Sequence, residues 1–172
     1  MHVTGTHMDI TTRLATPEDA PTLHAITQAA FDTLRGKIDP PSSAHRETVG
    51  TVSADLTTGS GAIAELAGIP VGAVRFRVEP DGLYVGRVAV DPAHRGRGVA
   101  RALMAAAERE AAARGLPETQ VHVRRTLTGN VAMFERLGYR VASEYVHPRD
   151  PSAAVLTLVK PVASADHRDP DG

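Results

Sequence analysis

The chain has 172 residues, of which 42% are hydrophobic and 23% charged, a composition typical of one globular domain. It has no cysteine, which excludes disulfide frameworks, thiolate zinc sites, iron–sulfur clusters and cysteine nucleophiles. The net charge of -1 and the aromatic content of 3% disfavour nucleic-acid binding, and no apolar run is long enough to cross a membrane. A cytoplasmic protein with no membrane or nucleic-acid partner is therefore expected.

We expect one domain over residues 9–162, between a flexible terminus or tag remnant (1–8) and a flexible tail (163–172). A first helix is predicted to begin at Thr16, because a Thr can cap it and Pro17 suits its first position. A second amphipathic helix is predicted around residues 49–56.

After residue 61 the pattern changes to short apolar runs separated by turn residues, which predicts strands. The predicted elements are strands at 62–66, 71–78 and 83–90, a long helix at 98–114, a strand at 119–123, a helix at 129–137, and a hairpin of strands at 139–146 and 154–160. Together they predict a single α/β (α+β) domain: a mixed, mostly antiparallel sheet with helices on both faces.

Positive charge is concentrated beside the long predicted helix. Residues 87–125 contain eight arginines and four acidic residues, an excess of +4 that leaves -5 for the rest of the chain. Within this stretch the loop R-G-R-G-V-A-R (95–101) opens directly onto the helix. Small residues let backbone N–H groups approach an anion, and a helix start favours negative charge. A glycine-rich turn with solvated arginines is the alternative interpretation.

Two segments resemble motifs of the GNAT superfamily of acyl-CoA-dependent N-acyltransferases. The segment R-G-R-G-V-A (95–100) resembles that family's R/Q-x-x-G-x-G/A loop, and N-V-A-M-F-E-R-L-G-Y (130–139) resembles its N-x-x-x-[YF]-x-x-L-G-[FY] motif. The predicted order of elements agrees over residues 10–161. The resemblance implies acetyl-CoA as co-substrate and direct transfer of an acetyl group to a primary amine.

The resemblance also implies a coenzyme site along a splayed central strand pair, residues 88–90 and 119–123. A backbone N–H near Val88 or Val90 would stabilise the oxyanion that forms when an amine attacks the thioester. Asn130 would contact the coenzyme, although it can equally be a helix cap. The coenzyme-binding residues implied are Val88, Ala89, Val90, Arg95, Gly96, Arg97, Gly98, Val99, Ala100, Arg101, Asn130 and Phe134.

The sequence departs from the family at its catalytic groups. Phe134 stands where the family has a Tyr that donates a proton to the departing thiolate, and Tyr84 stands where the family often has a Glu. The remaining candidates for the proton acceptor are Glu65, Tyr84, His122, Glu144 and Tyr145. For His122 a half-buried structural role is the alternative, since it alternates with valines along its strand.

The expected partner is a small-molecule or peptide amine, with a homodimer left open. No H-x-x-x-H or H-E-x-x-H spacing is present, so no metal is expected. A non-catalytic acyl-CoA-binding module, which has lost the catalytic acid and base, is the alternative function. An RNA-contacting protein that uses the clustered arginines is a more distant one.

Overall fold

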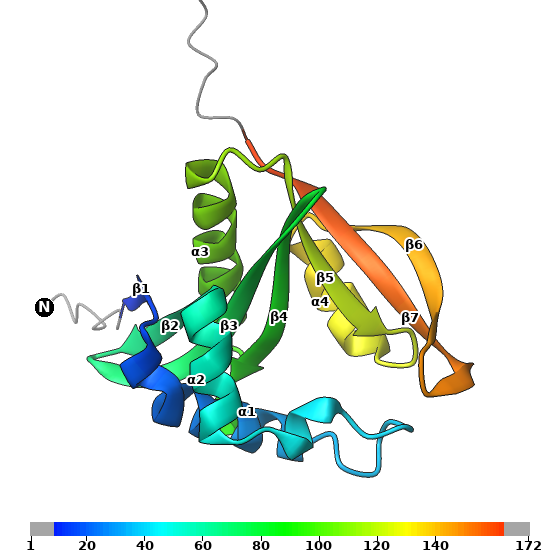
Figure 1. Ribbon diagram of the computed structural model, residues 1–172, viewed down its shortest axis with the longest axis horizontal. Coiled ribbons are helices and arrows are strands. Elements are labelled where there is room, and N and C mark those ends of the chain that lie inside the picture. Colours follow the sequence, from blue (N-terminus) through cyan, green and yellow to red (C-terminus); the bar gives the residue numbers. More distant parts are fainter. Residues whose placement is uncertain (1–8, 164–172) are drawn as a thin grey trace, which may run out of the picture.

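The computed structural model describes residues 9–163, which form a seven-stranded sheet with helices on both faces (Figure 1). The strands are β1 (Ile10–Leu14), β2 (Ser60–Leu66), β3 (Ile69–Glu79), β4 (Gly82–Val90), β5 (Glu118–Arg124), β6 (Arg140–His147) and β7 (Asp150–Pro161). The helices are α1 (Ala20–Asp32), α2 (Val49–Thr58), α3 (Val99–Ala113) and α4 (Thr128–Arg136). Short 3-10 turns lie at Pro17–Asp19, Ser43–Arg46 and Pro92–His94. The two terminal segments expected from the sequence lie outside the described residues, apart from residue 163.

The strand order is β1-β2-β3-β4-β5-β7-β6, and among these neighbours only β4 and β5 run parallel. This confirms the predicted mixed, mostly antiparallel sheet. No helix within residues 9–163 is both long enough and apolar enough to cross a membrane.

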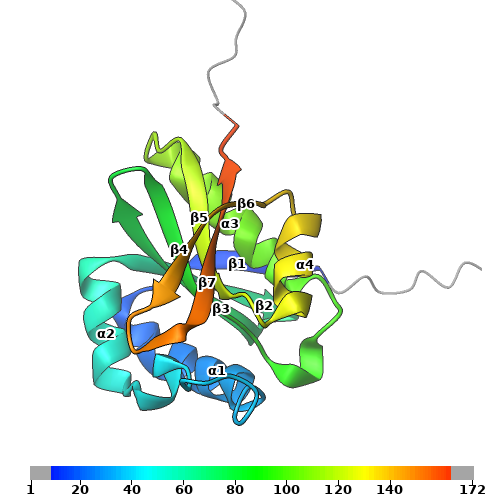
Figure 2. The ribbon, with the colours of Figure 1, turned by 90° about the vertical axis from the view of Figure 1, so that its right-hand side faces the viewer.

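Each face of the sheet has its own apolar core. On one face α1 and α2 pack on the middle of the sheet, and on the other face α3 and α4 pack on β2–β5 and β7 (Figure 2). The first core contains Ala20, Leu23, Ile26, Ala30, Val52, Leu56, Ile63, Ala73 and Ala89. The second contains, among others, Val74, Leu83, Val85, Val99, Leu103, Met104, Val121, Phe134 and Leu158.

Gly72 of β3 lets the start of α3 lie directly on the sheet. A Cβ at this position would lie 2.5 Å from Cγ1 of Val99 and 3.1 Å from Cδ1 of Leu103. Because such distances are closer than van der Waals contact, any side chain here would displace the first turns of α3. The position of this helix start is therefore set by the core beneath it.

The first strand is the element that the sequence did not predict. β1 is an edge strand paired antiparallel with β2, and most of its side chains are exposed or only partly buried. Arg13 of this strand forms ion pairs with Asp19 at 2.9 Å and with Glu65 at 2.8 Å. Hydrogen bonding to Arg13 lowers the pKa of Asp19 to about 2. These charges tie β1 to the beginning of the first helical segment, which starts as a 3-10 turn rather than as an α-helix.

Candidate active site

The central parallel pair of the sheet is open over most of its length. β4 and β5 are paired only at Leu83 with Thr119 and at Tyr84 with Gln120. β5 stays paired with β7 along its whole length, so the two parallel strands diverge after Tyr84 and Gln120 (Figure 1). The gap therefore begins after Gln120, and the prediction that residues 119–123 all lie in it is wrong for Thr119 and Gln120, which are paired with β4.

A β-bulge in β4 shapes one side of this gap. Ala73 pairs with Ala89 and Arg75 pairs with Gly86, so two residues of β4, Arg87 and Val88, lie opposite a single residue of β3. Arg87 has a positive φ of 52°, a backbone conformation that few non-glycine residues adopt. Bulges of this kind bend a strand and redirect its side chains. Here the bulge lets Arg87 reach the α1 side while the following residue lines the gap.

Backbone donors of β4 point into the gap. The N–H of Asp91 donates to the carbonyl of Val71 on β3 at 2.8 Å. Since successive N–H groups along a strand point in opposite directions, those of Val90 and Val88 face away from β3, toward the side that β5 has left. An extended amide chain could therefore pair with this edge of β4 as an added strand does.

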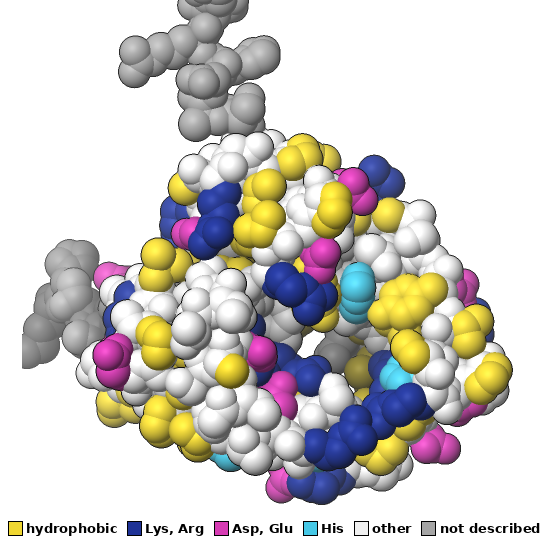
Figure 3. Space-filling view, viewed as in Figure 1, with side chains coloured by type: hydrophobic (Ala, Val, Ile, Leu, Met, Phe, Trp, Pro, Cys, Tyr) yellow, Lys and Arg dark blue, Asp and Glu magenta, His cyan; other side chains and the backbone are white. Residues whose placement is uncertain are grey.

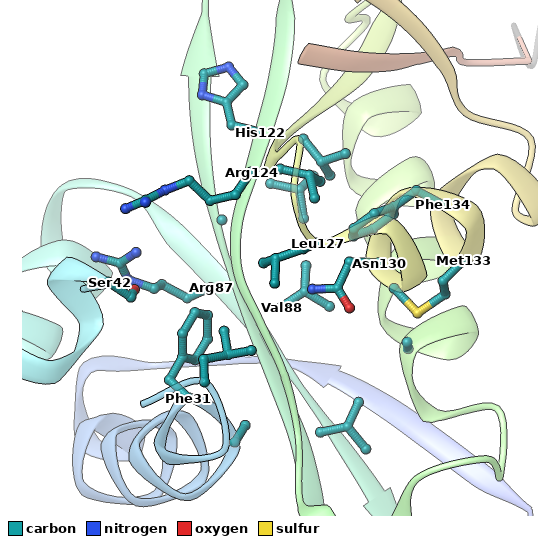
Figure 4. Close-up of a pocket in the computed structure, with 18 of the residues that line it drawn as sticks. Phe31, Ser42, Arg87, Val88, His122, Arg124, Leu127, Asn130, Met133 and Phe134 are labelled. Atoms are coloured by element: carbon teal, nitrogen blue, oxygen red, sulfur yellow. The ribbon is translucent and has the colours of Figure 1, made fainter. Parts of the chain in front are cut away.

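A cavity of about 920 Å³ occupies the gap and reaches both faces of the sheet. Its walls include Phe31 and Ser42 from the α1 side and Asn130 and Phe134 from α4 (Figure 4). The sheet lies between these two groups of residues. The cavity therefore passes from one face to the other through the opening between β4 and β5.

The loop before α3 presents unpaired backbone donors to this cavity. Gly96 and Gly98 have positive φ angles of 75° and 83°, and Gly98 is the N-cap of α3 without a side-chain cap. The first hydrogen bond into the helix is from Ala102 N–H to Gly98 carbonyl at 3.1 Å. The preceding N–H groups, those of residues 99–101, have no acceptor within the helix, which is the geometry that binds phosphate.

Arg95 anchors this loop to α1. Its guanidinium donates to Oγ1 of Thr33 at 3.1 Å and to the carbonyl of Ala30 at 3.3 Å. The loop is thus held from two sides, by α1 at Arg95 and by the sheet beneath α3. Such support keeps the unpaired amides in one arrangement before any ligand arrives.

The structure brings ten of the twelve expected coenzyme-binding residues to the wall of the cavity. They are Val88, Val90, Arg95, Gly96, Gly98, Val99, Ala100, Arg101, Asn130 and Phe134. The other two do not line it: the side chain of Ala89 is buried in the core under α1 and α2, and Arg97 is exposed.

Asn130 lies in the first turn of α4 and is not its cap. The N-cap residue of α4 is Leu127, and the N–H of Asn130 donates to the Leu127 carbonyl at 3.0 Å. Asn130 is among the residues that line the cavity, and Figure 4 shows its side chain there. The alternative interpretation of this residue as a simple helix cap is not what the structure shows.

No tyrosine near α4 supplies the proton donor that a Tyr in place of Phe134 would provide. The ring of Phe134 is buried, with its centroid 5.8 Å from that of Tyr139 in an edge-on arrangement. The Tyr139 hydroxyl is bonded to Oγ1 of Thr119 at 2.7 Å inside the core, and burial raises the pKa of Tyr139. Tyr139 does not line the cavity, so it offers no proton there.

Three of the expected proton-acceptor candidates meet at one end of the cavity. The ring centroid of His122 lies 4.8 Å from that of Tyr84 and 5.4 Å from that of Tyr145. Nδ1 of His122 lies 3.2 Å from the Tyr145 hydroxyl. Although part of the ring reaches solvent, desolvation between the two tyrosines lowers the pKa of His122, and Arg77 lowers it further. His122 is therefore mainly neutral at pH 7 and able to accept a proton.

The carboxylate candidates lie elsewhere. Glu65 pairs with Arg13 on β1, and Glu144 pairs with Arg125 at 2.7 Å on β6. Among the described residues that line the cavity there is no Asp or Glu, but there are six arginines (Arg87, Arg95, Arg101, Arg124, Arg136 and Arg149). The cavity is thus positively charged on both faces of the sheet.

An ion-pair network that was not predicted from the sequence supports the α1 side of the cavity. Glu47, before α2, accepts from Arg75 at 2.7 and 2.8 Å and from Arg87 at 2.7 Å. Arg75 also pairs with Asp55 at 2.9 Å, and Arg87 donates to Oγ of Ser43 at 2.6 Å. The partners come from distant parts of the chain, so no local spacing marks them.

Comparison with known proteins agrees with this geometry. The model of the acetyltransferase (GNAT) family matches residues 24–139. The chain belongs to this acetyltransferase family. Within the described residues, no group of three His, Asp or Glu side chains is placed to hold a metal ion.

Several solved structures share the fold. The ribosomal-protein-S18-alanine N-acetyltransferase from Escherichia coli is 19% identical, with a TM-score of 0.70 over 93% of this chain and 98% of that one. The PaiA N-acetyltransferase from Thermoplasma acidophilum, solved in complex with coenzyme A, is 15% identical, with a TM-score of 0.74 over 90% and 99%. A GCN5-related N-acetyltransferase from Rhodopseudomonas palustris is 26% identical, with a TM-score of 0.71 over 90% and 99%.

Proposed function

We propose that this protein is an acyl-CoA-dependent N-acyltransferase that moves an acetyl group from acetyl-CoA to a primary amine. The observation that carries the proposal is the open edge of β4, whose unpaired N–H groups at Val88 and Val90 lie in the same cavity as the unpaired amides in the first turn of α3. The edge of β4 can bind the amide chain of the coenzyme, and the amides of the first turn of α3 can bind its pyrophosphate.

In this mechanism the acetyl-CoA phosphates bind at residues 96–101, and the positive charge of Arg95 and Arg101 favours them. The pantetheine arm pairs with β4, and the thioester carbonyl accepts a hydrogen bond from the N–H of Val88 or Val90. That N–H would stabilise the oxyanion that forms when the amine attacks. Asn130 and Phe134 form the opposite wall, on the α4 side.

The amine enters from the α1 side, and its nitrogen attacks the thioester carbon. The N–C bond forms, the C–S bond breaks, and coenzyme A leaves as the thiolate. A thiol with an ordinary pKa of about 8.5 is acidic enough to leave without an obligatory acid. The proton from the amine passes to neutral His122, directly or through one water molecule.

The test is a turnover screen with acetyl-CoA and amines of different classes: amino acids, peptide N-termini, polyamines and aminoglycosides. Free thiol released in step with acetylated amine would support the proposal. Calorimetry with acetyl-CoA measures binding separately. If the protein bound neither acetyl-CoA nor coenzyme A, both the transferase and the binding module would be rejected.

Position 134 has a Phe instead of a proton-donating Tyr, and position 84 has a Tyr instead of a Glu. These two differences support a second candidate, a non-catalytic acyl-CoA-binding module. It would bind acetyl-CoA as tightly as the transferase would. It would show no thiol release above the rate without protein for any amine in the screen.

A further inference from the structure

On the α1 side of the cavity, two arginines, Arg124 and Arg149, form no ion pair with a described carboxylate. This side is where the proposed reaction would receive its amine, so the inference below rests on the proposed function. We propose that the acceptor amine also bears an anionic group, a carboxylate or a phosphate, which Arg124 and Arg149 bind.

Arg124 is the first part of this site. It lies at the end of β5, half-buried, and within the described residues no carboxylate lies within 4.0 Å of its guanidinium. Among the described residues, the side-chain hydrogen bond of its guanidinium is with Nε2 of His147 at 3.1 Å. Burial and the charge of Arg149 lower the pKa of Arg124, which is the expected result of placing two cations in one partly desolvated wall.

Arg149, in the turn between β6 and β7, completes the site. Its guanidinium donates a hydrogen bond to the carbonyl of Pro41 at 3.2 Å and forms no ion pair with a described residue. Asp39 and Asp150 act on Arg124 only at a distance. Asp150 is engaged by Ser152, whose N–H and hydroxyl donate to it at 2.9 and 2.7 Å.

Two other arginines on this side of the sheet, Arg75 and Arg87, are paired with carboxylates. Arg75 and Arg87 share Glu47, and Arg75 has Asp55 in addition, so this pair of cations is matched by two carboxylates. Arg124 and Arg149 form no such ion pair with a described residue, and they lie beside a cavity that has no acidic residue among its described lining residues. A guanidinium binds a carboxylate or phosphate in a two-pronged geometry.

These arginines are not on the side expected for the coenzyme phosphates. Figure 4 shows Arg124 and Arg87 extending toward Ser42, whereas Asn130 and Met133 lie on the α4 side. Figure 3 shows Lys or Arg, His, and some Asp or Glu side chains bordering the hollow on this face. His122 precedes Arg124 by two residues, so both side chains lie on the same face of β5, with the proton acceptor beside the anion site.

The experiment compares amines of equal chain length with and without an anion. One arm contains glycine, β-alanine, 4-aminobutyrate and 5-aminovalerate, each beside its amide, and a second arm contains O-phosphoethanolamine beside ethanolamine. For the chain length that fits the site, we expect kcat/KM to be about 10- to 100-fold higher for the anionic amine than for its neutral counterpart. The difference should lie mainly in KM, because charge-assisted hydrogen bonds strengthen binding by about this much. The carboxylate and phosphate arms show which anion is preferred.

Variants identify the residues responsible. Arg124→Gln and Arg149→Gln should each reduce the preference for the anionic member by about 10-fold or more. Arg125→Gln is the matched control, because Arg125 is the adjacent residue, is exposed and is paired with Glu144. It should keep the wild-type preference. Preference for a neutral amine or a polyamine, or a wild-type preference in both variants, would overturn the anion site while acetyl transfer stands.

A binding measurement keeps the test independent of turnover. N-acetylglycine, its longer homologues and their amides are titrated calorimetrically into the protein saturated with coenzyme A. Tighter binding of the acids in the wild type, lost in Arg124→Gln, supports the site even if no amine is acetylated, in which case the proposed transfer alone fails. Equal binding of acids and amides overturns the anion site.

Discussion

Tyr84 and Gln120 form the last pair between β4 and β5, and the cavity opens immediately beyond them. Tyr84 also lines that cavity, and the guanidinium of Arg77 lies over its ring, 4.8 Å from the centroid. The side chain that closes the paired part of the sheet therefore also forms the wall next to His122. Tyr84 thus both ends the paired part of β4 and β5 and packs against the proposed proton acceptor.

The loop before α3 can be tested at Gly98. With a φ of 83° and no atom within 4 Å of a Cβ, Gly98→Ala has room in the unliganded protein but carries backbone strain of about 1–2 kcal/mol. Its methyl group would face the expected pyrophosphate. We expect coenzyme A to bind at least about 10-fold more weakly by calorimetry.

Gly68 is the matched control for this strain. It has a φ of 77°, equally open surroundings, and lies in the turn between β2 and β3. Gly68→Ala should lose similar thermal stability and keep wild-type coenzyme affinity. Equal affinity losses in the two variants would refute the phosphate site.

His122 should control the acid side of the rate profile. Because desolvation lowers its pKa, the ring is neutral at pH 7 and kcat should fall only as the pH drops below the ordinary value of about 6.5. His122→Gln should lower kcat by about 10²- to 10⁴-fold and remove this limb. Tyr145→Phe keeps the ring packing and should shift the limb without removing it. A wild-type profile in His122→Gln would assign the proton to another group.

Phe134→Tyr should raise kcat or leave it unchanged. A phenol at this position of α4 could protonate the leaving thiolate, a contribution of up to about 10²- to 10⁴-fold if chemistry limits the rate. Phe31→Tyr adds a hydroxyl on the α1 side and should give no such gain. Phe134→Ala should cost about 3–5 kcal/mol of folding stability, because the ring is buried. A sharp fall in kcat for a folded, coenzyme-binding Phe134→Tyr would contradict the assigned role.

Glu47→Gln should destabilise the fold. Only 9% of the Arg75 side chain and 12% of the Glu47 side chain is exposed, so removing the carboxylate charge leaves two cations with one exposed partner, Asp55. We expect a loss of about 2–4 kcal/mol in denaturant unfolding. Glu79→Gln breaks the exposed pair with Arg77 and should cost no more than about 1 kcal/mol. Equal effects of the two substitutions would show that the network adds nothing.

Acid should weaken the fold in two separate windows. His122 and His147 have lowered pKa values in the folded protein. Below about pH 6.5 the unfolded chain therefore binds more protons than the folded one, and the free energy of unfolding decreases as the pH is lowered. Asp19 contributes stability above its ordinary pKa of 3.8, and this is lost as the pH falls toward about 2. Unfolding measured from pH 8 to 2 should show both slopes, and His122→Gln should weaken the upper one.

The sequence predicted most of the fold because its periodic segments and turn residues were strong. β1 was missed because most of its side chains are exposed, so it shows little apolar alternation, and because its ion pair with Glu65 joins residues 52 positions apart. The loop before α3, which we propose binds the coenzyme, was predictable because its glycines and the helix start are contiguous. The proposed anion site was not, since Arg124 and Arg149 meet only when the β6–β7 turn folds over β5.

The bulge in β4 illustrates a limit of such predictions. Leu83 and Val85 face the core under α3, but after the bulge Ala89 faces the core under α1 and α2. A strict alternation would place all three on one face. The extra residue is visible only in the register with β3, and a continuous apolar run does not show where it lies.

The passage through the sheet gives the molecule two entrances. If the coenzyme arrives by the α4 side and the amine by the α1 side, neither reactant blocks the other, and both are held at once in a ternary complex. Initial-rate plots at several fixed amine concentrations would then intersect rather than run parallel.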